Sequence, residues 1–200
     1  MPKFIFVTQR EIKIAETQEL RDSLDQRWFN FLDKAGFLPI LLPNNLALAK
    51  KIISKIDADG ILLTGGDDIK SLSGIYSKRE ELEDFLIKLA LKKKLPLFGV
   101  CRGMQKIQDS FGIPLGKVSG HVSAKQKILI NDKSREVNSF HKFGTTKNND
   151  REFKIFAVAK DGVIKAIRHK KHNICAVMWH PERFAKVCLE DIKLFHEVFK

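Results

Sequence analysis

Cysteine is scarce in this chain, which has three in 200 residues: Cys101, Cys175 and Cys188. An odd number of cysteines, none at metal-ligand spacing, argues against a disulfide framework and against a cysteine-based metal site. We therefore expect a reducing, cytoplasmic setting. We also expect Cys175 and Cys188 to be packing residues, because their surroundings in the sequence carry no chemical motif.

Long apolar runs are missing as well. No stretch approaches the roughly 20 apolar residues that cross a bilayer. The apolar run near the N-terminus, Phe4–Val7, is too short for the hydrophobic region of a signal peptide. We expect no membrane association and no export.

Basic residues outnumber acidic ones, 36 against 24, which gives a net charge of +12. Interleaved aromatic and basic residues, typical of RNA-binding surfaces, are absent, so we expect no nucleic-acid partner. Two interpretations of this charge stay open. In the first, the lysines, which are spread along the chain, only solubilise the surface. In the second, some of the basic residues bind an anionic substrate.

Short apolar runs alternate with amphipathic helical patterns over the first 111 residues, which is typical of the α/β class. The expected strands are Phe4–Val7, Phe37–Leu42, Gly60–Thr64 and Pro96–Val100. The expected helices are Leu20–Ala35, Leu46–Ile56, Arg79–Lys93 and Gly103–Phe111. Such an order predicts a doubly wound, mostly parallel sheet with helices on both faces.

The pattern changes after Pro114, where short strands separated by polar turns predict an antiparallel portion at the far side of the sheet. The expected strands are Lys127–Ile130, Arg135–Val137, Phe153–Ala159, Val163–Ile167 and Ile174–Trp179, followed by a closing helix, Leu189–Phe199. No linker divides the chain, so we expect a single domain over residues 1–200.

Gly99-Val100-Cys101-Arg102-Gly103 lies where the fourth expected strand meets its helix. A nucleophile elbow at such a junction needs small residues on both flanks because the turn is very tight. The following helix N-terminus offers unpaired N–H groups and a positive dipole end, which favour a thiolate. Alone, the pentapeptide equally fits a buried structural cysteine in a tight turn.

Trp179-His180-Pro181-Glu182 follows the last expected strand. A cysteine nucleophile needs a base, and that base needs a third group to fix its tautomer. His180 and Glu182 are two positions apart, so a turn at Pro181 can direct both side chains to the same side. Alone, this segment also fits a surface turn, but it ends a strand at the same expected sheet edge as Cys101.

Gly99–Gln105 together with His180–Glu182 resembles the class I glutamine amidotransferase family, and the resemblance covers nearly the whole chain. It implies a flavodoxin-like fold, Cys101 as nucleophile, and His180 and Glu182 as base and orienter. It also implies that no metal or organic cofactor is needed.

By the same resemblance, Thr64–Ile69 is the glycine turn that supplies one oxyanion-hole N–H group, here that of Gly66. The second would be the backbone N–H of Arg102. Two preformed donors of this kind lower the barrier by several kcal/mol in the usual estimates (~3 kcal/mol each). Gly65 and Gln105 would contact the glutamyl group.

Asn138-Ser139-Phe140-His141-Lys142 is similar to the segment that closes over the glutamyl group in the γ-glutamyl hydrolase branch. The resemblance implies that Asn138, Ser139, Phe140 and His141 contact the substrate, whereas the plain alternative for His141 is a polar loop residue. The implied substrate is a small γ-glutamyl conjugate, nucleotide-linked in the sharpest form of the hypothesis: γ-glutamyl-CDP-amidate, a conjugate of capsule biosynthesis. Its amide would be cut through a thioester to release glutamate.

Two other functions stay open at this point. A glutaminase subunit that passes ammonia to a separate synthase would use identical chemistry at Cys101. A catalytically inactive binding module is the other alternative, although both motifs are complete. His169 and His172 suggest a metal site only weakly, because no carboxylate or cysteine completes a ligand set in the sequence. The oligomeric state, a homodimer included, is not indicated.

Overall fold

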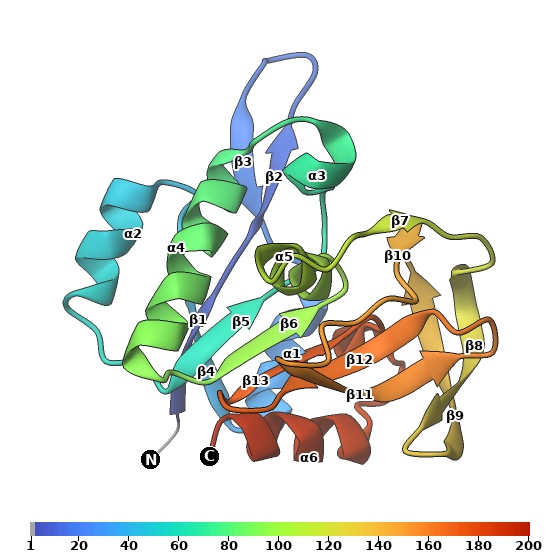
Figure 1. The fold of residues 1–200 in the computed structure, drawn as a ribbon. Coiled ribbons are helices and arrows are strands. Elements are labelled where there is room, and N and C mark those ends of the chain that lie inside the picture. Colours follow the sequence, from blue (N-terminus) through green and yellow to red (C-terminus); the bar gives the residue numbers. More distant parts are fainter. Residues whose placement is uncertain (1–2) are drawn as a thin grey trace.

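A nine-stranded mixed sheet forms the centre of the computed structural model, which describes residues 3–200 (Figure 1). Its strand order is β4-β1-β5-β6-β13-β12-β11-β8-β9. The first five strands run parallel and are β4 (Phe37–Leu41), β1 (Lys3–Val7), β5 (Gly60–Leu63), β6 (Leu97–Val100) and β13 (Ile174–Val177). The α/β fold with a parallel core and flanking helices, predicted from the sequence, is confirmed.

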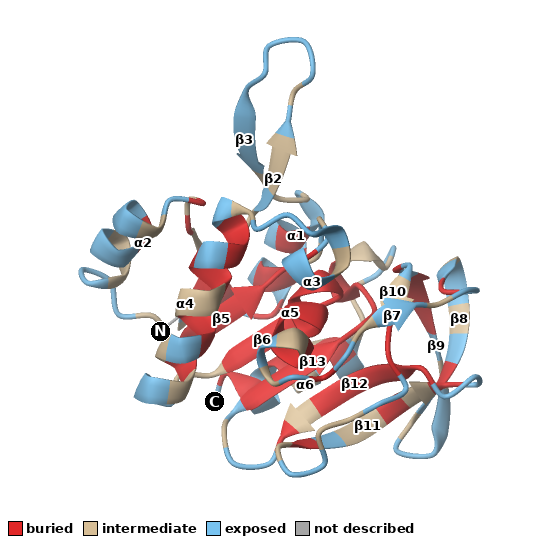
Figure 2. Ribbon diagram, turned by 45° about the horizontal axis from the view of Figure 1, so that its top comes forward, coloured by how far each residue is buried: buried red, intermediate tan, exposed pale blue. Residues whose placement is uncertain are grey.

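Helices cover both faces of the parallel strands (Figure 1). One face packs against α1 (Arg27–Lys34) and α6 (Leu189–Val198), and the other against α2 (Leu46–Ile53), α4 (Lys78–Lys93) and α5 (Arg102–Ser110). Within β1, Ile5 and Val7 belong to the first layer and Phe6 to the second, as the two-residue period of a strand requires. Strands β5, β6 and β13 are buried along their whole length, which explains their continuous apolar sequences (Figure 2).

The other half of the sheet is antiparallel, also as predicted. It consists of β12 (Ile164–His169), β11 (Phe153–Ala159), β8 (Val122–Ile130) and β9 (Lys133–Phe140). Strands β8 and β9 are joined at Asn131 and Asp132, both of which have positive φ. That geometry is what a two-residue hairpin with the right-handed strand twist requires. Both strands are longer than expected, and β9 extends through Asn138 to Phe140.

The largest departure from expectation is a hairpin in place of the first half of a helix. Leu20–Ala35 was expected to be helical throughout, but Leu20–Ser23 forms β3, paired antiparallel with β2 (Arg10–Lys13), and the helix begins only at Arg27. The prediction was wrong because the apparent periodicity counted Leu20, whose side chain is 59% exposed, as a buried position. The hairpin projects from the body of the molecule (Figures 1 and 2).

Smaller differences concern element ends. The helix expected over Leu46–Ile56 ends at Ile53, and the strand expected over Ile174–Trp179 ends at Val177. A short helix α3 (Lys70–Ser73), a 3-10 turn (Pro181–Arg183) and a small pair of strands, β7 (Gly116–Lys117) with β10 (Phe143–Gly144), were not anticipated.

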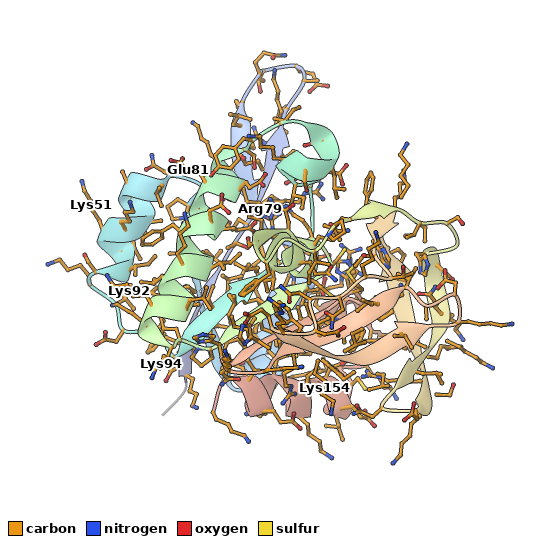
Figure 3. All side chains as sticks on the ribbon, viewed as in Figure 1. Lys51, Arg79, Glu81, Lys92, Lys94 and Lys154 are labelled. Atoms are coloured by element: carbon orange, nitrogen blue, oxygen red, sulfur yellow. The ribbon has the colours of Figure 1, made fainter. Side chains whose placement is uncertain are left out.

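The lysines that dominate the net charge are dispersed. Lys51, Lys92 and Lys154 lie on three different elements and point away from the body of the protein, whereas Arg79 is buried (Figure 3). Across residues 3–200, the helices are too short or too polar for any of them to cross a membrane.

Candidate active site

Cys101 occupies the turn between β6 and α5 in a strained backbone conformation, with φ of 52° and ψ of −105°. Such a conformation is rare for a residue with a side chain and costs on the order of 1–3 kcal/mol. Glycine is required on both sides. A Cβ at Gly103 would lie 2.1 Å from the carbonyl oxygen of Leu63, and one at Gly99 would lie 2.7 Å from Cδ1 of Ile107. The predicted tight elbow is therefore present.

His180 follows β13 and is held by partners on two sides. Its Nδ1 lies 2.6 Å from Oε1 of Glu182, and both side chains are buried. Such a bond fixes the tautomer with the proton on Nδ1 and leaves Nε2 as the ring nitrogen available to a thiol. The predicted relation between His180 and Glu182 is thus seen in the structure, within a 3-10 turn opened by Pro181.

Asn138 fixes the backbone of His180, a contact that the sequence did not reveal. Oδ1 of Asn138 accepts from the N–H of His180 at 2.8 Å, and Nδ2 donates to the carbonyl oxygen of His180 at 2.8 Å. Phe140, two residues further along β9, packs edge-on against the imidazole at 6.0 Å between ring centroids. Strand β9 therefore contacts both the backbone and the ring of His180.

The Cys101 thiol and the His180 ring are electrostatic partners. Burial lowers the pKa of His180, but electrostatic attraction to Cys101 and a hydrogen bond with it, followed by the same two effects from Glu182, outweigh burial and raise this pKa to about 9. A Cβ added to Gly65 would lie 2.7 Å from Cε1 of His180 and 3.6 Å from Cβ of Cys101, so the elbow and the imidazole ring both pack against Gly65. A thiol and an imidazole in this relation can exchange a proton.

The glycine turn after β5 approaches the elbow closely. Gly66 has φ of +136° and borders the same cavity as Cys101. Arg79 of α4 holds the carbonyl groups of the turn: it donates to the oxygen of Gly65 at 3.0 Å and to that of Thr64 at 2.6 Å.

A buried ion network joins the glycine turn to the elbow, and sequence analysis missed it. Arg79 donates from Nε to Glu83 at 2.9 Å, and the same carboxylate accepts from the guanidinium of Arg102. Burial lowers the pKa of Arg79 to about 10, whereas for Glu83 the two neighbouring guanidinium groups outweigh burial and lower its pKa. The Glu83 carboxylate thus links the glycine turn, through Arg79, to the elbow at Arg102.

One cavity opens directly over Cys101. Its walls include Gly66, Gln105, Phe140 and His141. Gln105 also donates from Nε2 to the carbonyl oxygen of Phe143 at 2.9 Å, which fixes its amide at the cavity wall.

The remaining residues expected at this wall face inward. Asn138 holds His180, and the hydroxyl of Ser139 donates to the carbonyl oxygen of His121 at 2.9 Å. Their side chains therefore support the wall from behind, and Gly65 borders a second cavity beside His180.

Lys165 of β12 is a further buried basic residue. It was not singled out from the sequence, because it lies within a strand expected from its apolar residues. Its Nζ lies 2.6 Å from Nε2 of His141 and 3.0 Å from the hydroxyl of Ser139. Burial lowers the pKa of Lys165 to about 8, and burial together with the charge of Lys165 lowers the pKa of His141 to about 3. His141 is therefore a neutral acceptor at Nε2, and its Nδ1 donates to the oxygen of Phe143 at 2.8 Å.

Metal-binding clusters of three or more histidine, cysteine or acidic side chains do not occur within residues 3–200. His169 instead lies 3.0 Å from a carboxylate oxygen of Glu152 and accepts from the backbone N–H groups of Lys171 and His172.

Comparison with known proteins identifies the family of this chain. The family model described as glutamine amidotransferase class-I matches residues 18–192. The γ-glutamyl-CDP-amidate hydrolase of Campylobacter jejuni subsp. jejuni serotype O:2 is 31% identical, and the alignment covers 98% of this chain and 97% of that protein. This chain belongs to the class-I glutamine amidotransferase family.

Less similar proteins also match. One subunit of the glutamine-hydrolysing GMP synthase of Methanococcus aeolicus is 27% identical, over 74% of this chain and 83% of that protein. Among solved structures, a chain of PurLQS from Thermotoga maritima superposes with a TM-score of 0.68 at 17% identity, covering 99% of this chain and 98% of that one. This structural likeness is a likeness of fold.

Proposed function

We propose that this protein is a cysteine hydrolase that cleaves the γ-glutamyl amide bond of a small anionic conjugate, γ-glutamyl-CDP-amidate in its most specific form. Cys101 is the nucleophile, His180 the acid–base group and Glu182 its orienter. The observation that carries the proposal is that the Cys101 elbow and the His180 ring both pack against Gly65, while Nδ1 of that ring lies 2.6 Å from Glu182. The γ-glutamyl-CDP-amidate hydrolase, similar over almost the full length of both chains, supports the substrate class.

The reaction begins with transfer of the Cys101 proton to Nε2 of His180. The thiolate attacks the γ-carbonyl carbon, a carbon–sulfur bond forms, and the carbonyl oxygen takes up negative charge next to the N–H groups of Gly66 and Arg102. Protonated His180 then donates to the departing nitrogen as the carbon–nitrogen bond breaks. The products of this step are an amine and a thioester on Cys101.

Water completes the cycle. The neutral imidazole of His180 accepts a proton from water while the water oxygen attacks the thioester carbon. When the carbon–sulfur bond breaks, the same proton passes from the imidazole to the sulfur of Cys101. Glutamate is released and the thiol is restored. These steps use only protein groups and water, so the proposal includes no metal and no organic cofactor.

The residues around the cavity have complementary roles in this proposal. Gln105, Phe140 and His141 border the space that the glutamyl group occupies. Asn138 and Ser139 act from behind the wall, since their side chains bond to the backbone of His180 and His121.

A second candidate is a glutaminase that delivers ammonia to a separate synthase. It is favoured by the 27% identity to one subunit of a glutamine-hydrolysing GMP synthase. The chemistry at Cys101 is the same, and the two candidates differ in the leaving group.

A panel of purified substrates tests both candidates. Glutamate release is measured with free glutamine, a neutral γ-glutamyl amide and γ-glutamyl-CDP-amidate, with wild-type protein and with Cys101→Ala. We expect the nucleotide conjugate to have the highest kcat/KM and Cys101→Ala to be inactive. Turnover of free glutamine in preference to the conjugates would favour the glutaminase, and full activity in Cys101→Ala would exclude both candidates.

A further inference from the structure

A second cavity, separate from the one over Cys101, lies beside His180. It is bordered by the glycine turn at Gly65 and Gly66, by His180 and Glu182, and by the base of the β2–β3 hairpin. Gly66 borders both cavities, so the two meet at the turn.

The proposed chemistry assigns different parts of the substrate to the two cavities. A thioester leaves the acyl group on the sulfur of Cys101, so the acyl group occupies the cavity that Cys101 borders. The nitrogen that departs must receive its proton from His180. The group attached to that nitrogen therefore extends past the imidazole, into the cavity that His180 and Glu182 border. This step rests on the proposed function.

Arg183 borders this second cavity with a guanidinium group that no carboxylate holds at a short distance. Its Nε is buried and has no hydrogen-bond partner within the part of the chain that the structure describes. Its distances to the carboxylates of Glu182 and Asp25, 3.4 Å and 3.9 Å, exceed those of good hydrogen bonds. Both carboxylates have shorter contacts elsewhere: Glu182 with His180 at 2.6 Å, and Asp25 with Arg27 at 2.6 Å.

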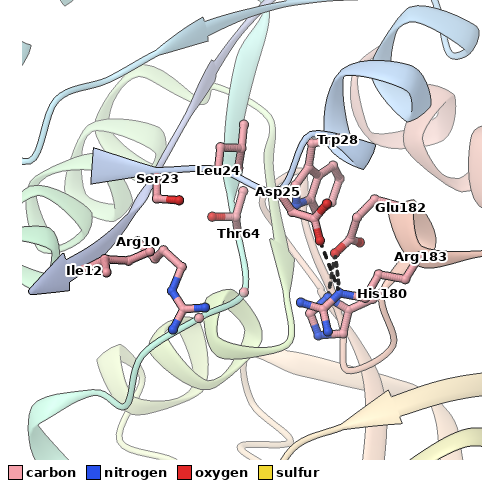
Figure 4. Close-up of a pocket in the computed structure, with 12 residues that line it drawn as sticks. Arg10, Ile12, Ser23, Leu24, Asp25, Trp28, Thr64, His180, Glu182 and Arg183 are labelled. Carbon is pink, nitrogen blue, oxygen red and sulfur yellow. Dashed lines mark hydrogen bonds and ion pairs between the residues drawn. The ribbon is translucent and has the colours of Figure 1, made fainter. Parts of the chain in front are cut away.

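Arg10 faces Arg183 across the cavity (Figure 4). The stem of Arg10 packs on the glycine turn, since a Cβ at Gly66 would lie 3.0 Å from Cβ of Arg10. Nη2 donates to Asp67 at 3.1 Å, while about half of the side chain is open to solvent. Arg10 is therefore anchored beside the proposed oxyanion site and can still bind a ligand.

Two guanidinium groups on opposite walls match one kind of ligand. Planar guanidinium groups form paired, charge-assisted hydrogen bonds with the oxygens of phosphates. The hydroxyl side chain of Ser23 adds a neutral polar group on the hairpin side (Figure 4). We propose that this cavity is the leaving-group subsite and binds a phosphate-type anion between Arg10 and Arg183.

The test compares an anionic and a neutral leaving group. The substrates are γ-glutamyl aminomethylphosphonate and γ-glutamyl methylamide, and the readout is the ratio of their kcat/KM values. The variants are Arg10→Gln and Arg183→Gln. Arg21→Gln is the matched control, because Arg21 lies on the same hairpin, is exposed and pairs with Glu19.

We expect the ratio to fall about tenfold or more in each of the two variants and to stay unchanged in Arg21→Gln, as the loss of a charged hydrogen bond predicts. A ratio that is unchanged in both variants, or that falls equally in Arg21→Gln, would overturn the subsite. Thermal melting of each variant shows that it is folded.

A binding measurement separates failure of the subsite from failure of the proposed function. Calorimetric titration with CDP, a diphosphate that needs no chemistry to bind, should give a Kd that rises about tenfold or more in Arg10→Gln and Arg183→Gln. An absence of CDP binding in wild-type protein that still cleaves the neutral amide would refute the anion subsite and leave the hydrolase standing. Absence of all turnover would refute the proposed function, and the leaving-group assignment with it.

Discussion

Arg79 and Glu83 form a fully buried ion pair one helical turn apart on α4, with Nε of Arg79 2.9 Å from the carboxylate. Their importance lies in what else each group touches. Arg79 binds the carbonyl groups of Thr64 and Gly65, and Glu83 also binds the guanidinium of Arg102 beside Cys101. The pair therefore ties the glycine turn and the elbow to one helix, so that their spacing is set before a substrate binds.

Substitution Glu83→Gln should be strongly destabilising and should also impair turnover. It removes the buried counter-charge that the guanidinium groups of Arg79 and Arg102 share, and losses of about 3–5 kcal/mol in the free energy of unfolding are typical of such a change. In protein that still folds, we expect kcat to fall more than KM rises, because the proposed oxyanion donors act most strongly in the transition state. Urea unfolding and steady-state kinetics measure the two effects.

Glu81→Gln is the control, since Glu81 is on the same helix but exposed (Figure 3). Its stability should change by less than about 0.5 kcal/mol. Equal effects of the two substitutions would contradict the role given to Glu83.

Replacing Cys101 by glycine should stabilise the fold while abolishing turnover. At φ of 52° and ψ of −105°, a side chain is strained by on the order of 1–3 kcal/mol. Glycine removes that strain, although its flexible unfolded state offsets about 0.5–1 kcal/mol of the gain. The comparison is with Cys101→Ala, which keeps the strain. A melting temperature of Cys101→Gly below that of Cys101→Ala would show that the elbow stores no strain.

The pKa of His180, raised to about 9, predicts how stability and activity depend on pH. Burial lowers this pKa, but Cys101 and Glu182 favour the protonated ring more strongly. The stabilisation from the protonated ring is complete below the ordinary pKa of 6.5 and is lost as the pH rises through about 9.

Activity should decline over the same range, because the departing nitrogen takes its proton from His180. We expect kcat/KM to fall with a pKa near 9 that belongs to the Cys101–His180 pair. In Glu182→Gln the decline should move to lower pH, since a negative partner of the ring is lost. An alkaline limit identical in both proteins would exclude Glu182 as the orienter.

Lys165 provides a prediction about the wall of the acyl cavity. In Lys165→Met, Nε2 of His141 and the hydroxyl of Ser139 lose their buried donor, which costs about 1–3 kcal/mol of stability. The loss should loosen His141 and raise KM for every γ-glutamyl substrate. Lys154→Met, an exposed lysine on the neighbouring strand β11, should change neither quantity. Unchanged KM in Lys165→Met would restrict Lys165 to a structural role.

The sequence predicted the parts of the site that are encoded locally. The flanking glycines of Cys101 and the turn at Pro181 have short-range steric causes, so five or fewer consecutive residues indicate them. Lys165 was missed because its partners Ser139 and His141 are far along the chain, and Glu83 was missed because its link to Arg102 is equally non-local. An isolated charge in a strand or an acidic residue on a charged helix carries no local sign of those partners.

The β2–β3 hairpin was missed for a related reason. Leu20–Ser23 pairs with Arg10–Lys13, and Asp22 holds Asn44 through its backbone N–H and its side-chain amide, at 3.0 Å and 2.8 Å. These contacts outweigh a helical pattern in which Leu24 and Trp28 are four residues apart. Tertiary pairing decided the conformation where local preference was ambiguous.

The separate hairpin sheet has a consequence for how such a protein can change. Cys101 and His180 follow β6 and β13 of the large sheet. Arg10 and Ser23 belong instead to a separate two-stranded sheet, β2–β3, whose strands do not pair with those of the large sheet. Mutations in the hairpin can reshape one half of the binding region without moving the reacting groups. Natural variation in the molecules accepted by relatives of this chain should therefore concentrate in that hairpin, while the bond being broken stays the same.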